Sequence, residues 1–203
     1  MNKRDEMLLK MYDQMFNDIN RHIMVIWQSI SVLVGAFAIF ALVEKNVISL
    51  DLAATIVLLL CAWLIAHLFD ASYWYNRNLV IIANIERQFL VSTDLKDIHY
   101  YFGSHRPKNK MIEHLRLQMA LGIGLGAIIL MYHFLDRVTP GLSSSLDKFD
   151  PIRCLPYIFV LIAICYLYKQ KNDSEKKYQE FLRNSPGIPI DTTGISYGIG
   201  HGH

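Results

Sequence analysis

Four apolar stretches without any Asp, Glu, Lys or Arg most constrain what this chain can fold into. They cover residues 23–43, 52–69, 117–135 and 155–168 of 203. Helices of a soluble domain keep one face polar, so a soluble domain of this size does not need four such stretches. A helix that crosses about 30 Å of hydrocarbon needs about 20 predominantly apolar residues. The pattern predicts an all-α integral membrane protein, built as a four-helix bundle in the lipid bilayer.

Composition agrees with a membrane protein and excludes other classes. Hydrophobic residues make up 53% of the chain and charged residues 19%. The four stretches leave too few residues for a separate soluble domain of ordinary size, about 100 residues or more. The net charge of +2 does not indicate nucleic acid binding. The N-terminus lacks the pattern of a cleaved signal peptide, so we expect the first stretch to direct membrane insertion.

The basic residues predict the orientation. All but four of the 20 Lys and Arg residues lie before the first stretch, between the second and third, or after the fourth. Cytoplasmic loops of membrane proteins carry an excess of Lys and Arg. We therefore expect a multi-pass protein of a bacterial inner membrane, with the central loop and both termini in the cytoplasm. The other side carries only Lys45, Arg137, Lys148 and Arg153.

The fourth stretch is the shortest of the four. Its 14 residues would cover about 21 Å as a helix. Pro156 suits a first helical turn, where its missing N–H costs nothing. Tyr157, Tyr166 and Tyr168 can lie at the membrane interfaces. We expect a span here, with a re-entrant or surface helix as the alternative.

Helix breakers are missing beyond the apolar stretches as well. The sequence has no Gly or Pro between Asp51 and Phe102, so the second span is predicted to continue as one helix to about Val91. Residues 108–116 are likewise expected to lead into the third span as a helix. We therefore expect a cytoplasmic helical layer beneath the spans, within a single membrane domain of residues 1–184, followed by an irregular Gly-rich tail. The layer comprises residues 1–22, 70–116 and 169–184, and the tail comprises residues 185–203.

Two pairs of residues within or beside the spans are candidate sites. Gly122 and Gly126 form a GxxxG pattern, which allows two helix backbones to approach closely, within the chain or between subunits. His67 and Asp70 are ionisable groups at the cytoplasmic end of the second span, where function or simple interfacial anchoring are both open.

The sequence predicts no catalytic, cofactor or metal site. It has no GxxxxGK[ST], GxSxG or HExxH motif. Its three cysteines and eight histidines are scattered, whereas a closed zinc site needs four ligands. We therefore do not expect an enzyme, and we expect no cofactor.

The flank of the second span carries a recognisable pattern. Residues 73–79 read YWYNRNL, and Ala83, Asn84, Ile85 and Glu86 follow shortly after. With the first two spans, this resembles small bacterial membrane proteins of the SLATT and RipA-like kind, whose transmembrane helices continue into a cytoplasmic helix. The resemblance implies an oligomeric membrane protein, with a pore-forming effector in bacterial conflict or stress as one form of it.

These observations favour a non-enzymatic, homo-oligomeric inner-membrane protein, with a membrane-perturbing or pore-forming effector in stress or phage defence as its most specific form. One alternative is a scaffold or sensor that recruits a cytoplasmic protein, and another is a small channel or transporter. The expected partners are the lipid bilayer, further copies of the chain and a cytoplasmic protein. The candidate partner face has two parts. One is a stripe of methionines before the first span, although such stripes more often pack inside the protein than bind a partner. The other follows the second span, and together the parts comprise Met7, Met11, Met15, Trp74, Arg77 and Asn84.

Overall fold

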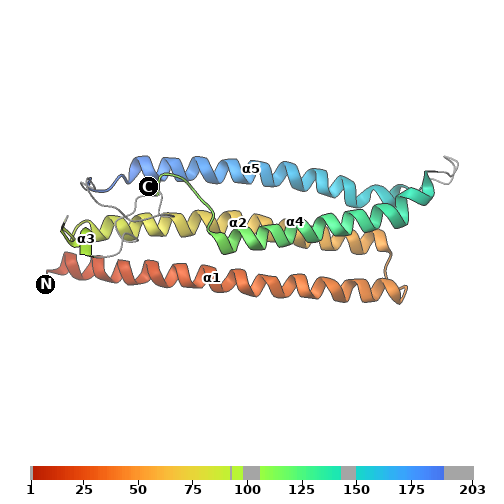
Figure 1. Cartoon of the computed structure of the whole chain (residues 1–203), viewed down its shortest axis with the longest axis horizontal. Coiled ribbons are helices and arrows are strands. Elements are labelled where there is room, and N and C mark those ends of the chain that lie inside the picture. Colours follow the sequence, from red (N-terminus) through yellow and green to blue (C-terminus); the bar gives the residue numbers. More distant parts are fainter. Residues whose placement is uncertain (1, 92, 98–105, 143–149, 190–203) are drawn as a thin grey trace. The chain divides into compact units, whose positions relative to one another are not determined.

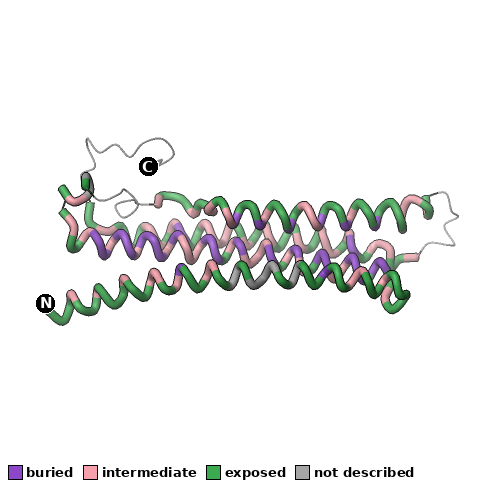
Figure 2. Tube along the Cα trace, turned by 60° about the horizontal axis from the view of Figure 1, so that its bottom comes forward, coloured by how far each residue is buried: buried purple, intermediate pink, exposed green. Residues whose placement is uncertain are grey.

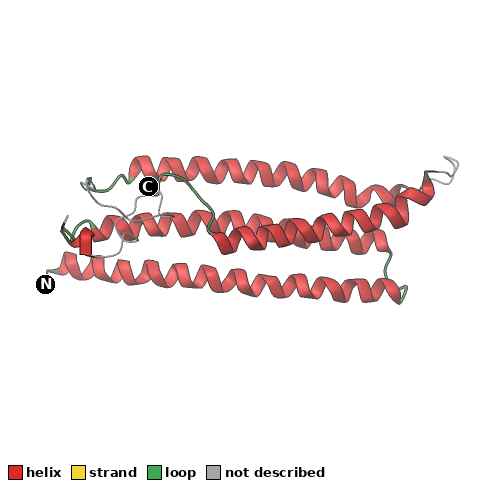
Figure 3. Ribbon diagram, viewed as in Figure 1, coloured by secondary structure: helices red, strands yellow, loops and turns green. Residues whose placement is uncertain are grey.

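The computed structural model of the chain describes residues 2–91, 93–97, 106–142 and 150–189, without the side chains of 25, 26, 28–30, 32 and 33. Within these ranges the chain forms helices and loops and no strand, which confirms the all-helical prediction (Figure 3). The elements are α1 (Lys3–Glu44), α2 (Leu50–Glu86), α3 (Asp94–Asp97), α4 (Glu113–His133), η2 (Phe134–Val138), η3 (Thr139–Gly141), η5 (Pro151–Cys154) and α5 (Leu155–Asn184) (Figure 1).

Three helical segments are long and apolar enough to cross a membrane. They are Leu50–Glu86, Glu113–Gly141 and Pro151–Asn184, which contain the second, third and fourth predicted spans. The first predicted span lies in α1, where several of its side chains are outside the described set. Its described apolar part, Val34–Glu44, is shorter than a span. Helices of membrane-spanning length and composition are therefore confirmed for three of the four stretches.

Polar side chains cap the starts of α1 and α2. Asn2 Oδ1 accepts a hydrogen bond from the backbone N–H of Asp5 at 2.9 Å, at the start of α1. Ser49 Oγ accepts one from the N–H of Leu52 at 3.2 Å, at the start of α2. Both caps satisfy backbone donors that no helical carbonyl can reach. These short motifs explain why the helices begin where they do.

Besides α1, which has 42 residues, two helices are longer than a bilayer requires. The 37 residues of α2 correspond to about 55 Å, and the 30 residues of α5 to about 45 Å. The hydrocarbon layer is about 30 Å thick. The predicted continuation of these two spans as helices is confirmed, although α2 ends at Glu86 and not near Val91. Residues 71–86 of α2 therefore lie beyond the uncharged apolar stretch 52–69 of the same helix.

The third span does not continue in the same way. Residues 108–112 have no helical structure, and α4 begins only at Glu113, so the prediction of a helix over 108–112 was wrong. Asn76 Nδ2 donates to the carbonyl of Lys110 at 3.0 Å and to Asn109 Oδ1 at 2.9 Å. These polar groups are bonded to α2 instead of to a helix of their own.

The chain divides into two compact units. Unit 1 contains Met1–Met24, Ala71–Lys110 and Ser174–His203, and unit 2 contains Val25–Asp70 and Met111–Asp173. The ranges of unit 1 correspond closely to the predicted helical layer, and those of unit 2 to the predicted spans. The location of unit 1 in the cytoplasm stays a prediction.

Each unit has its core around α2. In unit 1, Ile19 of α1 is buried against Leu79 and Ile82 of α2. In unit 2, the buried positions of α2 recur every three or four residues, as expected for one helix face. Figure 2 shows that buried residues follow α2. In unit 2 these residues are Ala53, Ala54, Val57, Leu58, Cys61, Leu64 and Leu68.

Candidate functional site

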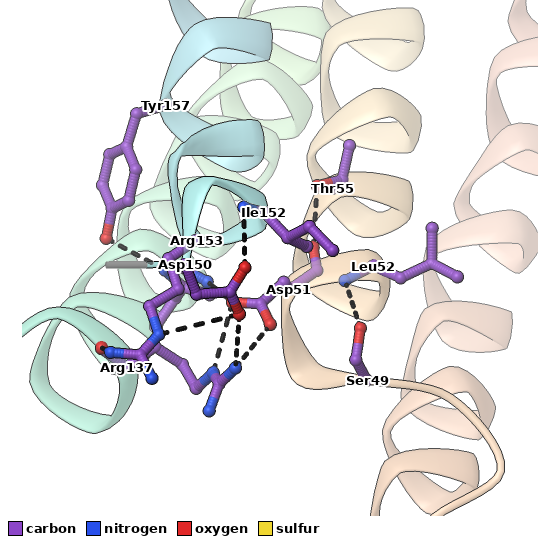
Figure 4. A network of polar contacts seen from close by, with 10 residues as sticks. Ser49, Asp51, Leu52, Thr55, Arg137, Asp150, Ile152, Arg153 and Tyr157 are labelled. Carbon is purple, nitrogen blue, oxygen red and sulfur yellow. Dashed lines mark hydrogen bonds and ion pairs between the residues drawn. The ribbon is translucent and has the colours of Figure 1, made fainter. Parts of the chain in front are cut away.

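Ionisable side chains from three helices meet in unit 2 (Figure 4). Asp51 lies in the first turn of α2, and His133 is the last residue of α4. Asp51 is 1% exposed and His133 is fully buried. Burying a carboxylate costs free energy unless the charge is paired and hydrogen-bonded. The groups that pair with Asp51 are therefore the other members of the site.

Both oxygens of the Asp51 carboxylate are paired. His133 Nε2 lies 2.9 Å from Asp51 Oδ1. Arg137 donates from Nε to Oδ1 at 3.2 Å and from Nη2 to Oδ2 at 2.9 Å. Two parallel bonds from one guanidinium are among the strongest contacts that a carboxylate can make in a protein. The negative charge of Asp51 is therefore compensated where it is buried.

The His133 ring lies between this carboxylate and a phenol. Its Nδ1 is 3.0 Å from the hydroxyl of Tyr157 on α5. An ionised carboxylate only accepts hydrogen bonds, so His133 Nε2 carries a hydrogen. In the neutral ring, Nδ1 then accepts from the Tyr157 hydroxyl. One imidazole thus links α2, α4 and α5 within unit 2.

A second acid and a second arginine extend the network. Asp150 Oδ2 lies 3.9 Å from Arg137 Nη2 and 4.0 Å from Arg153 Nε. Arg153 Nη1 donates to the carbonyl of Arg137 at 3.3 Å. Asp150 Oδ1 also accepts from the N–H of Ile152 at 3.1 Å, which caps the helix η5. With neutral His133, the two acids and two arginines leave the network without net charge.

Local backbone structure brings these groups together. The π-helical turn η2 follows α4 directly, and it places Arg137 about one turn after His133. Short π-helical turns are rare and often occur at functional sites. The Ser49 cap fixes the first turn of α2, where Asp51 lies. The network therefore depends on three helix ends at once.

The arrangement is suited to holding helix ends in one geometry, because one imidazole bonds Asp51 and Tyr157 at once. A buried ion pair adds little net stability over apolar packing, but removing one partner is costly. Within the part of the chain that the structure describes, no group of three or more His, Cys, Asp and Glu side chains is placed to hold a metal ion.

Unit 1 has a polar centre of its own at Asn76, which is fully buried. Besides its bonds to Asn109 and Lys110, Asn76 Nδ2 donates to the carbonyl of Ser72 at 2.8 Å. Asn76 Oδ1 accepts from Arg106 Nη1 at 3.1 Å. This amide ties the segment before α4 to α2.

The residues of the candidate partner face lie in two different environments. Met7 is 62% exposed and Met11 40% exposed on α1. Met15 packs against the core of unit 1. The role of this face in partner binding stays a prediction.

Its α2 members make contacts inside unit 1. The Arg77 guanidinium lies 5.1 Å from the ring centre of Trp74, and Trp74 stacks on His22 at 6.1 Å. Asn84 Nδ2 donates to the carbonyl of Ser185 at 3.1 Å. These three side chains have structural partners in the same chain, as does the Met15 end of the stripe.

The candidate interfacial pair lies outside the Asp51 network. His67 stacks on Trp63 with ring centres 5.6 Å apart. Asp70 is exposed. Both lie in unit 2, three positions apart on α2.

The GxxxG pair lies against α2 of the same chain. A Cβ atom on Gly122 would lie 3.3 Å from Leu64 Cδ2, and one on Gly126 would lie 3.6 Å from Leu58 Cδ2. A Cβ on Gly124 would meet nothing within 4 Å. The glycines at 122 and 126 therefore allow α4 and α2 to pack closely, and leucine side chains fill the space beside them.

Replacing Gly122 with Leu is expected to lower the free energy of unfolding of the detergent-solubilised chain by about 1–3 kcal/mol, and with it the melting temperature. The added atoms would have to displace Leu64 from a packed contact. The matched control is Gly124→Leu, which adds the same atoms to an open position of α4. Equal melting temperatures for the two variants would show that the α2–α4 contact is not close-packed.

The sequence pattern did not reveal the Asp51 network. Its partners are far apart along the chain, since Asp51 and His133 are separated by 82 positions. One available signal was that Arg137 and Arg153 are two of the few basic residues on the side poor in them. Another was that His133 is the one histidine within the stretch 117–135, which has no Asp, Glu, Lys or Arg.

Comparison with known proteins gave no match. No protein-family model matches the chain, and the searches of curated proteins and of solved structures found no significant similarity.

Proposed function

We propose that this chain is a non-enzymatic, homo-oligomeric membrane protein of a bacterial inner membrane. In this proposal four helices cross the bilayer as a bundle, both termini lie in the cytoplasm, and unit 1 forms a cytoplasmic helical layer. Subunits associate through α5 in the membrane.

The observation that carries the proposal is the uncovered apolar surface of α5. Only 6% of the most apolar 18-residue stretch in the segment Pro151–Asn184, which contains α5, is buried inside the chain. The corresponding stretch of α2 is 39% buried. Exposed apolar surface of this extent needs lipid or another subunit to cover it. The exposed large side chains lie on several faces of the helix, so that lipid and a neighbouring subunit can share them: Ile158, Leu161, Ile162, Ile164, Tyr166 and Tyr168.

Cysteine cross-linking tests the association, because α5 has a native thiol on its exposed surface. Cys165 is exposed, whereas Cys61 is buried and Cys154 is partly buried. Oxidation of the full chain in lipid vesicles is expected to give a dimer-sized band through Cys165. Two cysteines can be bridged when their Cα atoms approach to within about 7 Å. A bismaleimide extends the reach to subunits whose Cys165 residues lie farther apart.

The Cys165→Ser variant is expected to lose the cross-linked band, while Cys61→Ser and Cys154→Ser keep it. A monomeric mass in detergent and in vesicles, together with no Cys165-dependent product from either reagent, would contradict the proposal. A band that instead depends on Cys154 would place the subunit contact at the start of α5.

The most specific form of the proposal is an effector that perturbs the membrane when a cytoplasmic signal reaches unit 1. Dye or ion leakage from vesicles that contain the full chain would support this form. Sealed vesicles under every activating condition would leave an oligomer without effector activity.

A scaffold or sensor that recruits a cytoplasmic protein is the second candidate. It is favoured by the exposed start of the Met stripe, at Met7 and Met11. It predicts a co-purifying protein that is lost when Met7 and Met11 are replaced by Gln, with the spans unchanged.

A channel or transporter is the third candidate, and the α2–α4 contact limits where its pore could lie. Leucine side chains lie beside Gly122 and Gly126, so the described contact between these helices is packed and apolar. A pore between subunits is the form that agrees with this packing.

A further inference from the structure

A buried carboxyl group lies in unit 1, where α1 packs against the end of α2. Glu86 is 7% exposed. Its Oε1 accepts a hydrogen bond from the hydroxyl of Tyr12 at 3.0 Å. Its Oε2 is buried and has no hydrogen-bond partner among the described residues. An ionised carboxylate has room for about four hydrogen bonds, so one bond leaves it poorly compensated.

The neighbouring charges do not compensate for this burial. From α1, Tyr12 faces Glu86 and Asp13 adds negative charge beside Tyr12. Directly after α2, Arg87 contributes a positive charge, but it is itself partly buried, and its Nε has no hydrogen-bond partner among the described residues. Burial raises the pKa of the Glu86 carboxyl to about 7, although the Tyr12 hydrogen bond and Arg87 lower it in part. Burial and Glu86 raise the pKa of Tyr12 to about 12, so Tyr12 stays a donor.

The same contact holds the first half of α1 on α2. Tyr12 not only bonds Glu86 but also packs with Met15 and Phe16 against the cluster of Ile19, Leu79 and Ile82. On the N-terminal side of Tyr12, Arg4 Nη2 donates to Gln88 Oε1 at 3.0 Å on the exposed surface. Exposed polar contacts of this kind contribute little to the free energy that holds two helices together. Of these two polar contacts, the Tyr12–Glu86 hydrogen bond is the one shielded from water, so docking of this half of α1 depends more on it.

We propose that Glu86 is a proton-binding site that controls how tightly the N-terminal half of α1 docks on α2 within unit 1. The protonated carboxylic acid closes the contact, because a neutral group is tolerated at this buried position. The ionised carboxylate loosens it, because release of α1 lets water solvate the charge. This regulation goes beyond the proposed function, which does not require it.

The direction of the pH dependence follows from linkage. The docked form holds the proton more tightly than the released form, in which Glu86 titrates at its ordinary value near 4.5. Docking is therefore strongest below about pH 4.5 and weakens by up to tenfold per pH unit until about pH 7. Above about pH 7 both forms are ionised, and docking no longer changes with pH.

Amide hydrogen exchange on the full chain in detergent micelles tests the proposal. Protection factors, which correct for the chemical exchange rate, are measured for peptides from residues 3–16 between pH 5 and pH 8. In the unmodified chain they are expected to fall by up to tenfold per pH unit between about pH 5 and pH 7 and then to level off. In Glu86→Gln they are expected to stay at the low-pH level, because the amide is a neutral mimic of the acid.

Two further variants separate titration from simple packing. Tyr12→Phe removes the hydrogen bond that stabilises the carboxylate, so the levelling of the profile is expected at higher pH than in the unmodified chain. Glu6→Gln changes an exposed acid on the same helix and is expected to leave the profile unchanged. A pH profile that is flat in the unmodified chain, or equally steep in Glu86→Gln, would overturn the proposal, whatever the result of the Cys165 cross-linking.

Discussion

Replacing Asp51 with Ala is expected to destabilise the solubilised full chain by about 3 kcal/mol or more. Removal of one member of a buried ion pair costs about 3–5 kcal/mol, because the other member keeps its charge without its partner. His133 has no access to solvent and would lose its acceptor at Nε2. Arg137 is 31% exposed, so water can compensate part of its loss and the lower end of the range applies. Thermal unfolding in detergent, followed by circular dichroism, measures the effect.

The control for this experiment is Asp70→Ala, which removes the same group from an exposed position of the same helix. Substitutions at the surface usually change the free energy of unfolding by no more than about 0.5 kcal/mol. Arg137→Ala is expected to be destabilising as well, and the double variant should cost less than the sum of the single ones, because the two charges are lost together. Equal unfolding temperatures for Asp51→Ala and Asp70→Ala would show that the network does not hold unit 2 together.

Replacing Asn76 with Asp is expected to have the second large effect. It should lower the free energy of unfolding by about 2–3 kcal/mol, through lost contacts in unit 1. The amide nitrogen donates to Ser72, Asn109 and Lys110. In the carboxylate, an oxygen would face these three acceptors, and each would lose its donor in a buried site. Among the described partners of Asn76, the guanidinium of Arg106, which already donates to Asn76 Oδ1, is the one positive charge that would compensate the new carboxylate.

Hydrogen exchange of residues 106–112 should report this loss directly, since the amide bonds of Asn76 hold this segment to α2. The control is Asn20→Asp, at an exposed position of α1 in the same unit. We expect faster exchange of residues 106–112 in Asn76→Asp and no change in Asn20→Asp. Unchanged exchange in both variants would mean that other contacts hold the segment.

The long helices could be predicted because their cause is local in the sequence. A run of apolar residues without Gly or Pro has few alternatives to a helix, in lipid or in a packed bundle. The extension of α2 to Glu86 and the continuation of α5 beyond Tyr168 follow from the absence of Gly and Pro in both stretches. The start of α4 does not, because Asn76 competes for the backbone of Lys110 from 34 positions away.

The sites could be predicted only where neighbours in the sequence make them. Gly122 and Gly126 are recognisable from their spacing, although the sequence leaves open whether they face another subunit or, as the structure shows, α2. Asp51, His133 and Glu86 give no such pattern, because their partners come from other helices. His133 has no distinctive neighbour in the sequence, and its bonds to Asp51 and Tyr157 exist only in the folded unit.

The sequence by itself determined that this is a helical chain whose apolar segments, three of them long enough to span a membrane, continue into polar ones. The reason is that hydrophobicity and helix continuity are properties of consecutive residues. Only the tertiary structure decided which polar groups are buried and paired. Burial depends on contacts between segments far apart in the chain, such as Tyr12 with Glu86 and Arg137 with Asp51. The groups that carry the largest expected effects are therefore those that the apolar pattern did not mark.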